Sequence, residues 1–384
     1  MAGVLQVRAI SEAAHLAYVA ARPSVSFLQT PAWGRVKPDW TSQSIGWFPA
    51  SSDEPVGAGL VLYRRVPGLP RGLPRHLAYL PEGPDIPWAA ETSAGRIDSW
   101  LDPLVAYLKT QHAFAVRLGP PVPVRSWDTA TLKAALASGS ATRLDDLPPS
   151  WTDDAAATIA PALAERGWRP EPDTEGFATG QPRHVFQLPL AGRDEDDVFA
   201  GFNQLWRRNV RKAAKVGVEV SLGTRGDLDA FHALYLETAH RDGFTPRPLS
   251  YFRGMWDAMT AEDAGRLQLY LARHDDDLVA ATTMVKVGTH AWYSYGASSG
   301  ARREVRGSNA VQWRMITDAL AAGADVYDLR GITATLDPDD PHVGLIQFKL
   351  GTGGNAVEYP GEWTLPLNVP LFRAFELYLA RRGS

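Results

Sequence analysis

Hydrophobic and polar positions alternate along the first half of the chain in a way that predicts an α/β module. Apolar residues at every second position indicate half-buried strands, and apolar residues at every third or fourth position indicate amphipathic helices. Read in order, the patterns give a helix, a loop, three strands, a second helix and a fourth strand. The helices cover residues 11–21 and 94–112, the loop 27–33, and the strands 44–48, 56–66, 76–80 and 113–118.

The second half repeats this order of elements. Turn signals at Asp275-Asp-Asp277 and Gly288-Thr-His290 separate three consecutive strand patterns. The repetition indicates two copies of one α/β module. Helices are predicted at 227–239, 250–259 and 309–322, and strands at 267–273, 278–287, 290–296 and 326–329.

Residues 119–183 lie between the two modules and are rich in Pro, Gly, Ser and Asp. We interpret them as an ordered connection that contains one helix at 154–166. The chain ends in a predicted strand at 363–365 and a helix at 370–382, which we expect to pack back on the first module. The predicted domains are therefore 1–184 plus 361–384, and 185–360.

Composition narrows the class of protein. With 384 residues the chain is long enough for two domains, and its net charge of −4 excludes a generally basic, nucleic-acid-binding surface. The chain has no cysteine, so thiol nucleophiles, disulfides and cysteine-ligated metals are excluded. We find no signal peptide and no apolar run approaching the roughly 20 residues that span a bilayer. We expect a cytoplasmic protein with at most peripheral membrane contact.

The clearest candidate for chemistry is Lys349. It lies in the apolar, strand-like run Gly344-Leu-Ile-Gln-Phe-Lys-Leu350, beside Phe348 and ahead of the glycine-rich turn Gly351-Thr-Gly-Gly354. We expect its charge to line a wet cleft, where it would suit an oxygen that becomes negative during acyl transfer. The alternative is a lysine that snorkels to the surface from a strand edge.

A second candidate is the basic segment 206–215. Helical spacing of three and four residues places its cations on one face, which suits a phosphate backbone. The alternative is a solvated face at a helix C-terminus, capped by Gly217. The cations are Arg208, Arg211, Lys212 and Lys215.

Several of these segments together resemble the Fem family (FemA, FemB and FemX type) of aminoacyl-tRNA-dependent peptidyl transferases. They are Phe202-Asn-Gln-Leu-Trp-Arg-Arg208, 240–252, 292–299, 327–332 and 344–354. The resemblance covers essentially the whole chain and is strongest to the FemX and VanK-like members of actinomycetes. It implies two acetyltransferase-like (GNAT-like) domains in tandem. The helical hairpin of the larger members is absent here, because a strand directly follows the basic helix.

The resemblance also implies a reaction. A primary amine of a peptidoglycan precursor stem peptide attacks the ester carbonyl of an aminoacyl-tRNA, without CoA, metal or other cofactor. The leading hypothesis is transfer of glycine to lipid II. The alternatives are a tRNA-dependent peptide ligase in antibiotic biosynthesis or glycopeptide resistance, an acyl-CoA-dependent GNAT enzyme, and a non-catalytic tRNA-binding protein. The CoA alternative lacks support, because Arg303-Glu-Val-Arg-Gly-Ser308 fits the pyrophosphate-binding loop of those enzymes poorly.

By the same resemblance, Lys349 is the catalytic lysine that stabilises the oxyanion, and the Phe348 carbonyl orients the attacking amine. The cations of the basic segment would contact tRNA. Serine-triad, zinc and P-loop chemistry find no support. The nine histidines show no ligand spacing, and no Lys-Ser/Thr pair follows Gly351-Thr-Gly-Gly354.

The resemblance further assigns a precursor site. Lys37 matches a lysine that contacts the precursor diphosphate, and Arg247, Tyr251 and Tyr295 match residues of the same site. The alternatives are an exposed charge for Lys37 and core packing for the two tyrosines. One position departs from the family: Gly119 stands where several FemX-type members have an acidic residue that helps to hold the precursor.

Overall fold

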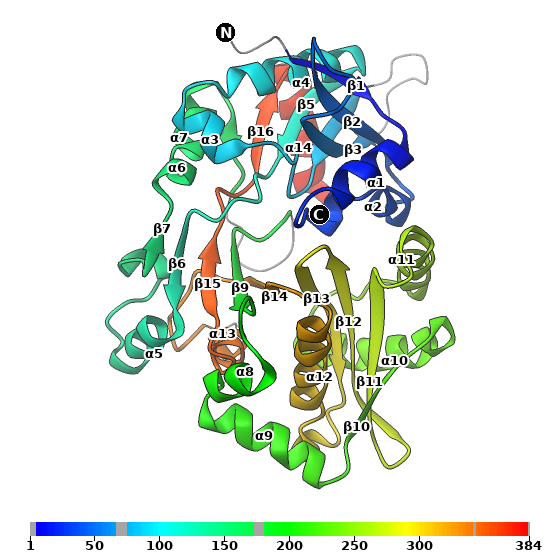
Figure 1. Cartoon of the computed structure of the whole chain (residues 1–384), viewed down its shortest axis with the longest axis vertical. Helices are drawn as coiled ribbons and strands as arrows, with labels where there is room; N and C mark the ends of the chain where they lie inside the picture. The colour runs from blue at the N-terminus through cyan, green and yellow to red at the C-terminus, as the bar shows by residue number, and fades with distance from the viewer. Residues whose placement is uncertain (1–4, 67–74, 173–179, 341–342, 383–384) are drawn as a thin grey trace. The chain divides into compact units, whose positions relative to one another are not determined.

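The computed structural model describes residues 5–66, 75–172, 180–340 and 343–382 and shows a mixed α/β chain (Figure 1). The chain divides into two compact units. Unit 1 comprises Met1–Trp127, Pro148–His184 and Val357–Ser384, and unit 2 comprises Asp128–Leu147 and Val185–Ala356. The units follow the predicted domains except at two segments. Residues 128–147 belong to unit 2 and not to the first domain, and residues 357–360 belong to unit 1 and not to the second domain.

Unit 1 contains a seven-stranded sheet in the order β1-β2-β3-β4-β5-β16-β8. Its paired strands run antiparallel except β4 and β5, which run parallel because a helical crossover joins them. The strands are β1 (Leu5–Ala9), β2 (Thr41–Pro49), β3 (Gly57–Arg65), β4 (His76–Leu80), β5 (Ala113–Leu118), β8 (Arg169–Pro170) and β16 (Trp363–Pro366).

Helices supply the rest of the unit 1 core. The indole of Trp47 on β2 donates a hydrogen bond of 2.9 Å to the Trp100 carbonyl of α4, so a buried polar group is satisfied inside an apolar cluster. On a second cluster, Phe372 and Phe375 of the last helix pack with Phe114 of β5. The helices are α1 (Glu12–Ala20), α2 (Pro31–Val36), α3 (Trp88–Ser93), α4 (Asp98–Thr110), α6 (Asp154–Ala157), α7 (Ile159–Glu165) and α14 (Val369–Arg382).

Two local predictions in unit 1 were wrong. The stretch 27–33, predicted as a loop, contains a 3-10 turn (Phe27–Gln29) and the start of α2, whose Pro31 is at a position that favours helix initiation. The single helix predicted at 154–166 is divided into α6 and α7 at Thr158, whose hydroxyl donates to the Ala155 carbonyl at 2.6 Å.

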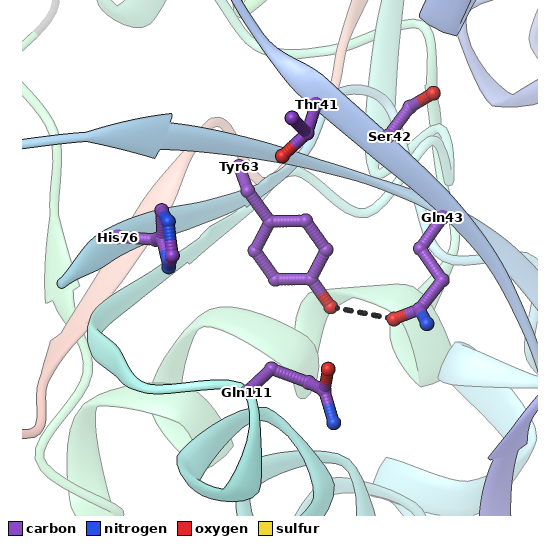
Figure 2. A pocket seen from close by; sticks show the side chains of 6 residues that line it. All are labelled: Thr41, Ser42, Gln43, Tyr63, His76 and Gln111. Atoms are coloured by element: carbon purple, nitrogen blue, oxygen red, sulfur yellow. Dashed lines mark hydrogen bonds between the residues drawn. The ribbon is translucent and has the colours of Figure 1, made fainter. Parts of the chain in front are cut away.

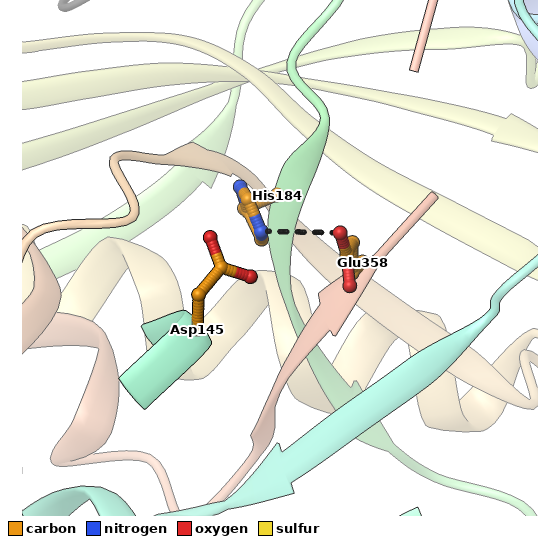
Figure 3. A group of neighbouring side chains, drawn as sticks. All are labelled: Asp145, His184 and Glu358. Atoms are coloured by element: carbon orange, nitrogen blue, oxygen red, sulfur yellow. Dashed lines mark ion pairs between the residues drawn. The ribbon is translucent and has the colours of Figure 1, made fainter. Parts of the chain in front are cut away.

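A cluster of charged side chains lies within unit 1, at the ends of three strands. Glu358, at the end of β15 (Asn355–Glu358), is 3% exposed and pairs with Arg125 of β6 (Arg125–Asp128) and with Arg183. Its Oε1 also lies 3.9 Å from Nε2 of His184, the first residue of β9 (His184–Pro189) (Figure 3). Because a buried carboxylate needs such partners, the cluster ties these strand ends together. β6 also pairs with the short β7 (Trp151–Thr152).

Unit 2 repeats the arrangement of unit 1. Along its sheet the strands follow the order β10-β11-β12-β13-β14-β9-β15, with antiparallel pairs from β10 to β13 and a parallel pair of β13 and β14. The helix α12 connects that parallel pair, as α4 precedes β5 in unit 1. The strands are β9 (His184–Pro189), β10 (Glu219–Leu222), β11 (Leu267–His274), β12 (Asp277–Val287), β13 (His290–Ser298) and β14 (Val326–Ile332).

Helices cover both faces of the unit 2 sheet. Leu269 and Leu271 of β11 pack with Phe231 of α10, whereas Tyr270 between them interacts with Asp318 of α12. Neighbouring residues of a strand point to opposite faces, so α10 and α12 lie on opposite sides. The helices are α5 (Thr129–Ser138), α8 (Glu195–Gly201), α9 (Gln204–Lys215), α10 (Leu228–Asp242), α11 (Leu249–Glu262), α12 (Gly307–Ala321) and α13 (Val343–Leu350).

The strand-like run around Lys349 was predicted wrongly: it is the helix α13. A short apolar run fits a buried strand or a buried helix equally well, and only one of its residues is β-branched. In the folded chain Ile346, Lys349 and Leu350 are buried together, which is the spacing of one helix face. Among the described residues, no helix is long and apolar enough to cross a membrane.

Candidate active site around Lys349

Lys349 is at the C-terminal end of α13 and only 3% of it is exposed, so the predicted wet cleft is not its environment in this structure. Its ammonium donates to two successive backbone carbonyls at the end of β14. The Nζ lies 2.6 Å from the Gly331 oxygen and 3.1 Å from the Arg330 oxygen. A lysine ammonium carries three N–H donors, so these two bonds fix its position and leave one donor for a substrate.

The pKa of Lys349 reflects opposing influences from burial and from two neighbouring charges. Burial, opposed by the Asp328 charge and assisted by the Arg330 charge, lowers the pKa of Lys349 to about 7. Asp328 is itself buried, yet His290, Arg330 and Gln187 hold the pKa of its carboxyl below the usual range. The carboxylate is therefore negative near neutral pH and favours the positive form of Lys349.

Phe348 is fixed by a partner on α9. The Trp206 indole donates to the Phe348 carbonyl at 2.8 Å, and the two rings lie 4.8 Å apart. The Gly351 backbone N–H donates to the same oxygen at 3.2 Å, so both of its lone pairs are engaged in this structure. The glycine-rich turn makes the contact possible, because a Cβ at Gly351 would lie 1.9 Å from Trp206 Cδ1.

Three predicted precursor-site residues come together elsewhere in unit 2. The hydroxyls of Tyr251 on α11 and Tyr295 on β13 are 2.9 Å apart, and the Arg247 guanidinium lies 5.5 Å from the centre of the Tyr251 ring. Burial, followed by the neighbouring Tyr295, raises the pKa of Tyr251 well above its usual value. Both tyrosines also contact Phe252, so core packing and a polar site coexist here.

Lys37 lies in unit 1, directly after α2. It is partly exposed, and its Nζ lies 4.8 Å from the centre of the Trp33 ring, a cation–π contact that restrains the charge without neutralising it. Arg35, two residues earlier, instead pairs with Glu12 at 2.6 Å.

The basic segment forms α9, as predicted, and its cations share one exposed face. Trp206, Asn209, Val210 and Ala213 form the buried face of the helix. No ion pair joins the four cations to an acidic residue within the part of the chain that the structure describes. These cations are Arg208, Arg211, Lys212 and Lys215.

Comparison with known proteins identifies the family. The model of the FemAB family matches residues 10–275 and 258–379. The chain belongs to the FemAB family. Relatives include the lipid II:glycine glycyltransferases of Staphylococcus haemolyticus and Staphylococcus saprophyticus, each 24% identical over 96% of this chain and 94% of the relative.

Solved structures confirm the predicted fold class for this FemAB chain. A crystal structure of FemX matches with a TM-score of 0.76 at 22% identity, over 96% of this chain and 99% of FemX. A tandem GNAT protein from the clavulanic acid biosynthesis pathway matches with a TM-score of 0.50 at 14% identity, over 94% and 98% of the two chains. The two α/β units are therefore GNAT-like units in tandem.

The structure brings a carboxyl group to Gly119, the position at which this FemAB chain departs from the predicted pattern. A Cβ added to Gly119 would lie 3.3 Å from Cγ of Glu362. The Tyr79 hydroxyl donates a hydrogen bond to the Glu362 carboxylate, and burial raises the pKa of Glu362 to about 7. Glu362 was not predicted as a site residue from the sequence. The only feature that could have indicated it is its position as an acidic residue directly before the apolar strand predicted at 363–365.

Sequence reasoning also missed Asp328, although it quoted the segment 327–332 for the family resemblance. The sequence feature that could have indicated Asp328 is a single acidic residue within an apolar strand. A carboxylate at such a position is costly to bury without partners.

A cavity of about 240 Å³ in unit 1 lies apart from the predicted site residues. Figure 2 shows its centre, where the Tyr63 hydroxyl donates to Oε1 of Gln43 at 2.9 Å; Tyr107 donates to the same oxygen. The side chains that line this cavity are polar, and none of them was predicted as a site residue. They belong to Thr41, Ser42, Gln43, Tyr63, His76 and Gln111.

Proposed function

We propose that this FemAB protein transfers glycine from an aminoacyl-tRNA to the side-chain amine of a lipid II stem peptide. The observation that carries the proposal is the buried ammonium of Lys349, fixed by the Arg330 and Gly331 carbonyls in a chain whose relatives are lipid II:glycine glycyltransferases. A fixed positive charge of this kind is what an acyl-transfer oxyanion requires.

In the proposed reaction, the neutral amine attacks the ester carbonyl carbon and a C–N bond forms. The carbonyl oxygen becomes an oxyanion, which the remaining N–H of Lys349 stabilises. The bond from the carbonyl carbon to the ribose oxygen then breaks, and the proton lost by the amine ends on that ribose oxygen. An amide and a free tRNA result, so neither a metal nor an organic cofactor is needed.

The two substrates have separate candidate binding groups. We assign the precursor to Lys37, Arg247, Tyr251 and Tyr295, because cations and phenolic hydroxyls suit a diphosphate. We assign the tRNA to the exposed cations of α9, because a row of unpaired positive charges suits a phosphate backbone. The reaction would take place in the cytoplasm, with peripheral contact to the membrane that carries lipid II.

A second candidate has the same chemistry and a different acceptor amine. The observation that favours it is Gly119, which replaces an acid expected to hold the precursor. A tRNA-dependent peptide ligase acting on another precursor or on an antibiotic peptide would use Lys349 in the same way.

The decisive experiment supplies radiolabelled glycyl-tRNA to the purified protein with lipid II, with the nucleotide-linked precursor, or with no acceptor. Labelled acetyl-CoA replaces glycyl-tRNA in a parallel series, and other aminoacyl-tRNAs test the choice of amino acid. Label in lipid II that depends on glycyl-tRNA would support the proposal. Transfer from acetyl-CoA, or only to an acceptor other than lipid II, would contradict it.

A further inference from the structure

Asp328 on β14 is a buried carboxylate to which the proposed reaction assigns no task. It is 1% exposed and has three polar neighbours within unit 2. Its Oδ1 accepts from the Arg330 backbone N–H at 2.5 Å, and its Oδ2 accepts from the Gln187 amide at 3.1 Å. Nε2 of His290 lies 3.5 Å from the same Oδ2. Such a satisfied buried group is a specific feature, because a buried carboxylate without partners destabilises a fold.

The bond from Arg330 to Asp328 closes a turn of unusual conformation. Arg330 has φ of +63°, in the left-handed region that residues with a side chain rarely adopt. An aspartate that accepts the N–H two residues later forms an Asx turn, which compensates for such a conformation. The carbonyls of Arg330 and Gly331 follow this turn directly, so the turn sets the direction in which they point.

Those two carbonyls are the groups that hold Lys349. We propose that Asp328 is a positioning residue: its carboxylate fixes the Arg330 turn and thereby aims both carbonyl oxygens at the Lys349 ammonium. This inference rests on the proposed function, since it explains how the reactive ammonium is placed. Asp328 itself contacts no substrate in this scheme.

Asp328 also acts on Lys349 through its charge. The charged groups that face Lys349 are Asp328, which raises its pKa, and Arg330, which lowers it. Behind Asp328 lies His290, whose ring stacks on Trp292 at 4.0 Å between ring centres. Removal of the Asp328 charge therefore makes the positive form of Lys349 harder to maintain.

The test compares Asp328→Asn with a matched control, Asp325→Asn. Asp325 precedes the same strand and is exposed, so its substitution removes the same charge without touching the turn. The proton affinity of Lys349 is measured by NMR on lysine-labelled protein, with the signal assigned through Lys349→Met. Separate kinetics give kcat and KM for both substrates.

We expect Asp328→Asn to lower the pKa of Lys349 and to shift the alkaline limb of kcat to lower pH. The kcat should fall by about 10- to 100-fold, the usual effect of losing a residue that orients a reactive group, with little change in either KM. Asp325→Asn should leave the Lys349 pKa, the pH dependence of kcat, kcat itself and both KM values unchanged. An Asp328→Asn protein that folds and matches Asp325→Asn in both pKa and kcat would overturn the electrostatic part of the inference, because asparagine still offers an Oδ1 to the Arg330 N–H.

A second pair of variants tests the turn itself. Asp328→Ala removes the hydrogen bond to Arg330. Adding Arg330→Gly to that variant introduces a residue that adopts positive φ at little cost, so the turn no longer needs the bond. The double variant should recover at least part of the kcat lost in Asp328→Ala. A double variant no faster than Asp328→Ala would contradict the positioning role. If the parent protein transfers no amino acid from any tRNA, the proposed function fails, and the NMR titration still decides whether Asp328 controls Lys349.

Discussion

The indole of Trp206 lies in the space that a side chain at position 351 would need. Gly351 has no Cβ, and an added one would be 1.9 Å from Trp206 Cδ1 and 2.2 Å from Nε1. The same indole donates to the Phe348 carbonyl, one residue before Lys349. A tryptophan of α9 and a glycine after α13 therefore fix the end of the helix that carries the proposed catalytic lysine.

Gly351→Ala should destabilise the protein, because Trp206 is a buried ring that cannot move aside freely. We expect a loss of about 1–3 kcal/mol in the free energy of unfolding, as for other overpacked cores, and a fall in kcat as the end of α13 shifts. Urea unfolding and steady-state kinetics measure the two effects.

Gly344→Ala is the matched control, since nothing lies within 4 Å of a Cβ at this exposed position of the same helix. Alanine favours helix over glycine, so this variant should be as stable as the parent or more so. Equal stability of the two alanine variants would show that Trp206 does not constrain position 351.

Lys349→Met should lower kcat by about 10²–10³-fold, the usual effect of removing one oxyanion donor. Methionine approximates the volume of the buried lysine, so loss of packing is small, although two carbonyls lose their donor. Single-turnover assays with labelled aminoacyl-tRNA measure the chemical step.

Lys286→Met is the control for this lysine. Lys286 also donates to a backbone carbonyl, that of Ala322 at 3.4 Å, but at the surface. The Lys286→Met protein should have the same kcat as the parent protein. A folded Lys349→Met protein within a few-fold of the parent rate would exclude the assigned role.

The rate should fall as pH rises above neutral. Burial lowers the pKa of Lys349 from 10.5 to about 7, and the proposed role needs the protonated form. Above pH 7 the ammonium loses its proton, so kcat should decrease about tenfold per pH unit. Rates at saturating substrate, corrected for ester hydrolysis, test this, and a rate that rises steadily to pH 9 would indicate that Lys349 acts unprotonated.

The same pKa shift predicts a trend in stability. Between pH 7 and 10.5 the unfolded chain binds the Lys349 proton and the folded chain does not, so the free energy of unfolding contributed by this group rises with pH. Urea unfolding at several pH values should show a steeper rise for the parent than for Lys349→Met. Parallel curves would mean that the folded lysine has an ordinary pKa.

Lys37→Ala and Arg247→Ala should each weaken binding of the precursor more than binding of aminoacyl-tRNA, because both cations are assigned to the diphosphate. Separate titrations with the two ligands measure this difference. Arg35→Ala is the control for Lys37, since Arg35 is nearby and already paired with Glu12. Equal losses for both ligands would remove these residues from the precursor site.

Arg208→Gln with Lys212→Gln should weaken tRNA binding and flatten its dependence on salt. Binding releases one set of counterions for each phosphate that a cation neutralises. Each lost contact therefore reduces the slope of log affinity against log salt by about 0.7–0.9. The double variant Arg225→Gln with Arg253→Gln is the control, because these exposed arginines already pair with Asp257 and Asp229. If both double variants keep the parent slope, the tRNA site lies elsewhere.

The sequence by itself determined the order of the elements and the repeat of the module. The strand patterns at 76–80, 113–118 and 267–273 survive folding with bounds changed by at most one residue, because short apolar runs of this length are typical of buried strands. The basic face of α9 was equally readable, since exposed charges at helical spacing need no knowledge of the partner surface.

Only the tertiary structure decided the environment of the proposed catalytic lysine. The run 344–350 is too short and too apolar for its period to distinguish strand from helix, and only the folded chain shows a helix with Ile346, Lys349 and Leu350 buried on one face. The burial of Lys349 and its bonds to the Arg330 and Gly331 carbonyls depend on β14 lying beside α13. Such contacts join residues distant along the chain, and local pattern carries no information about which distant groups will meet.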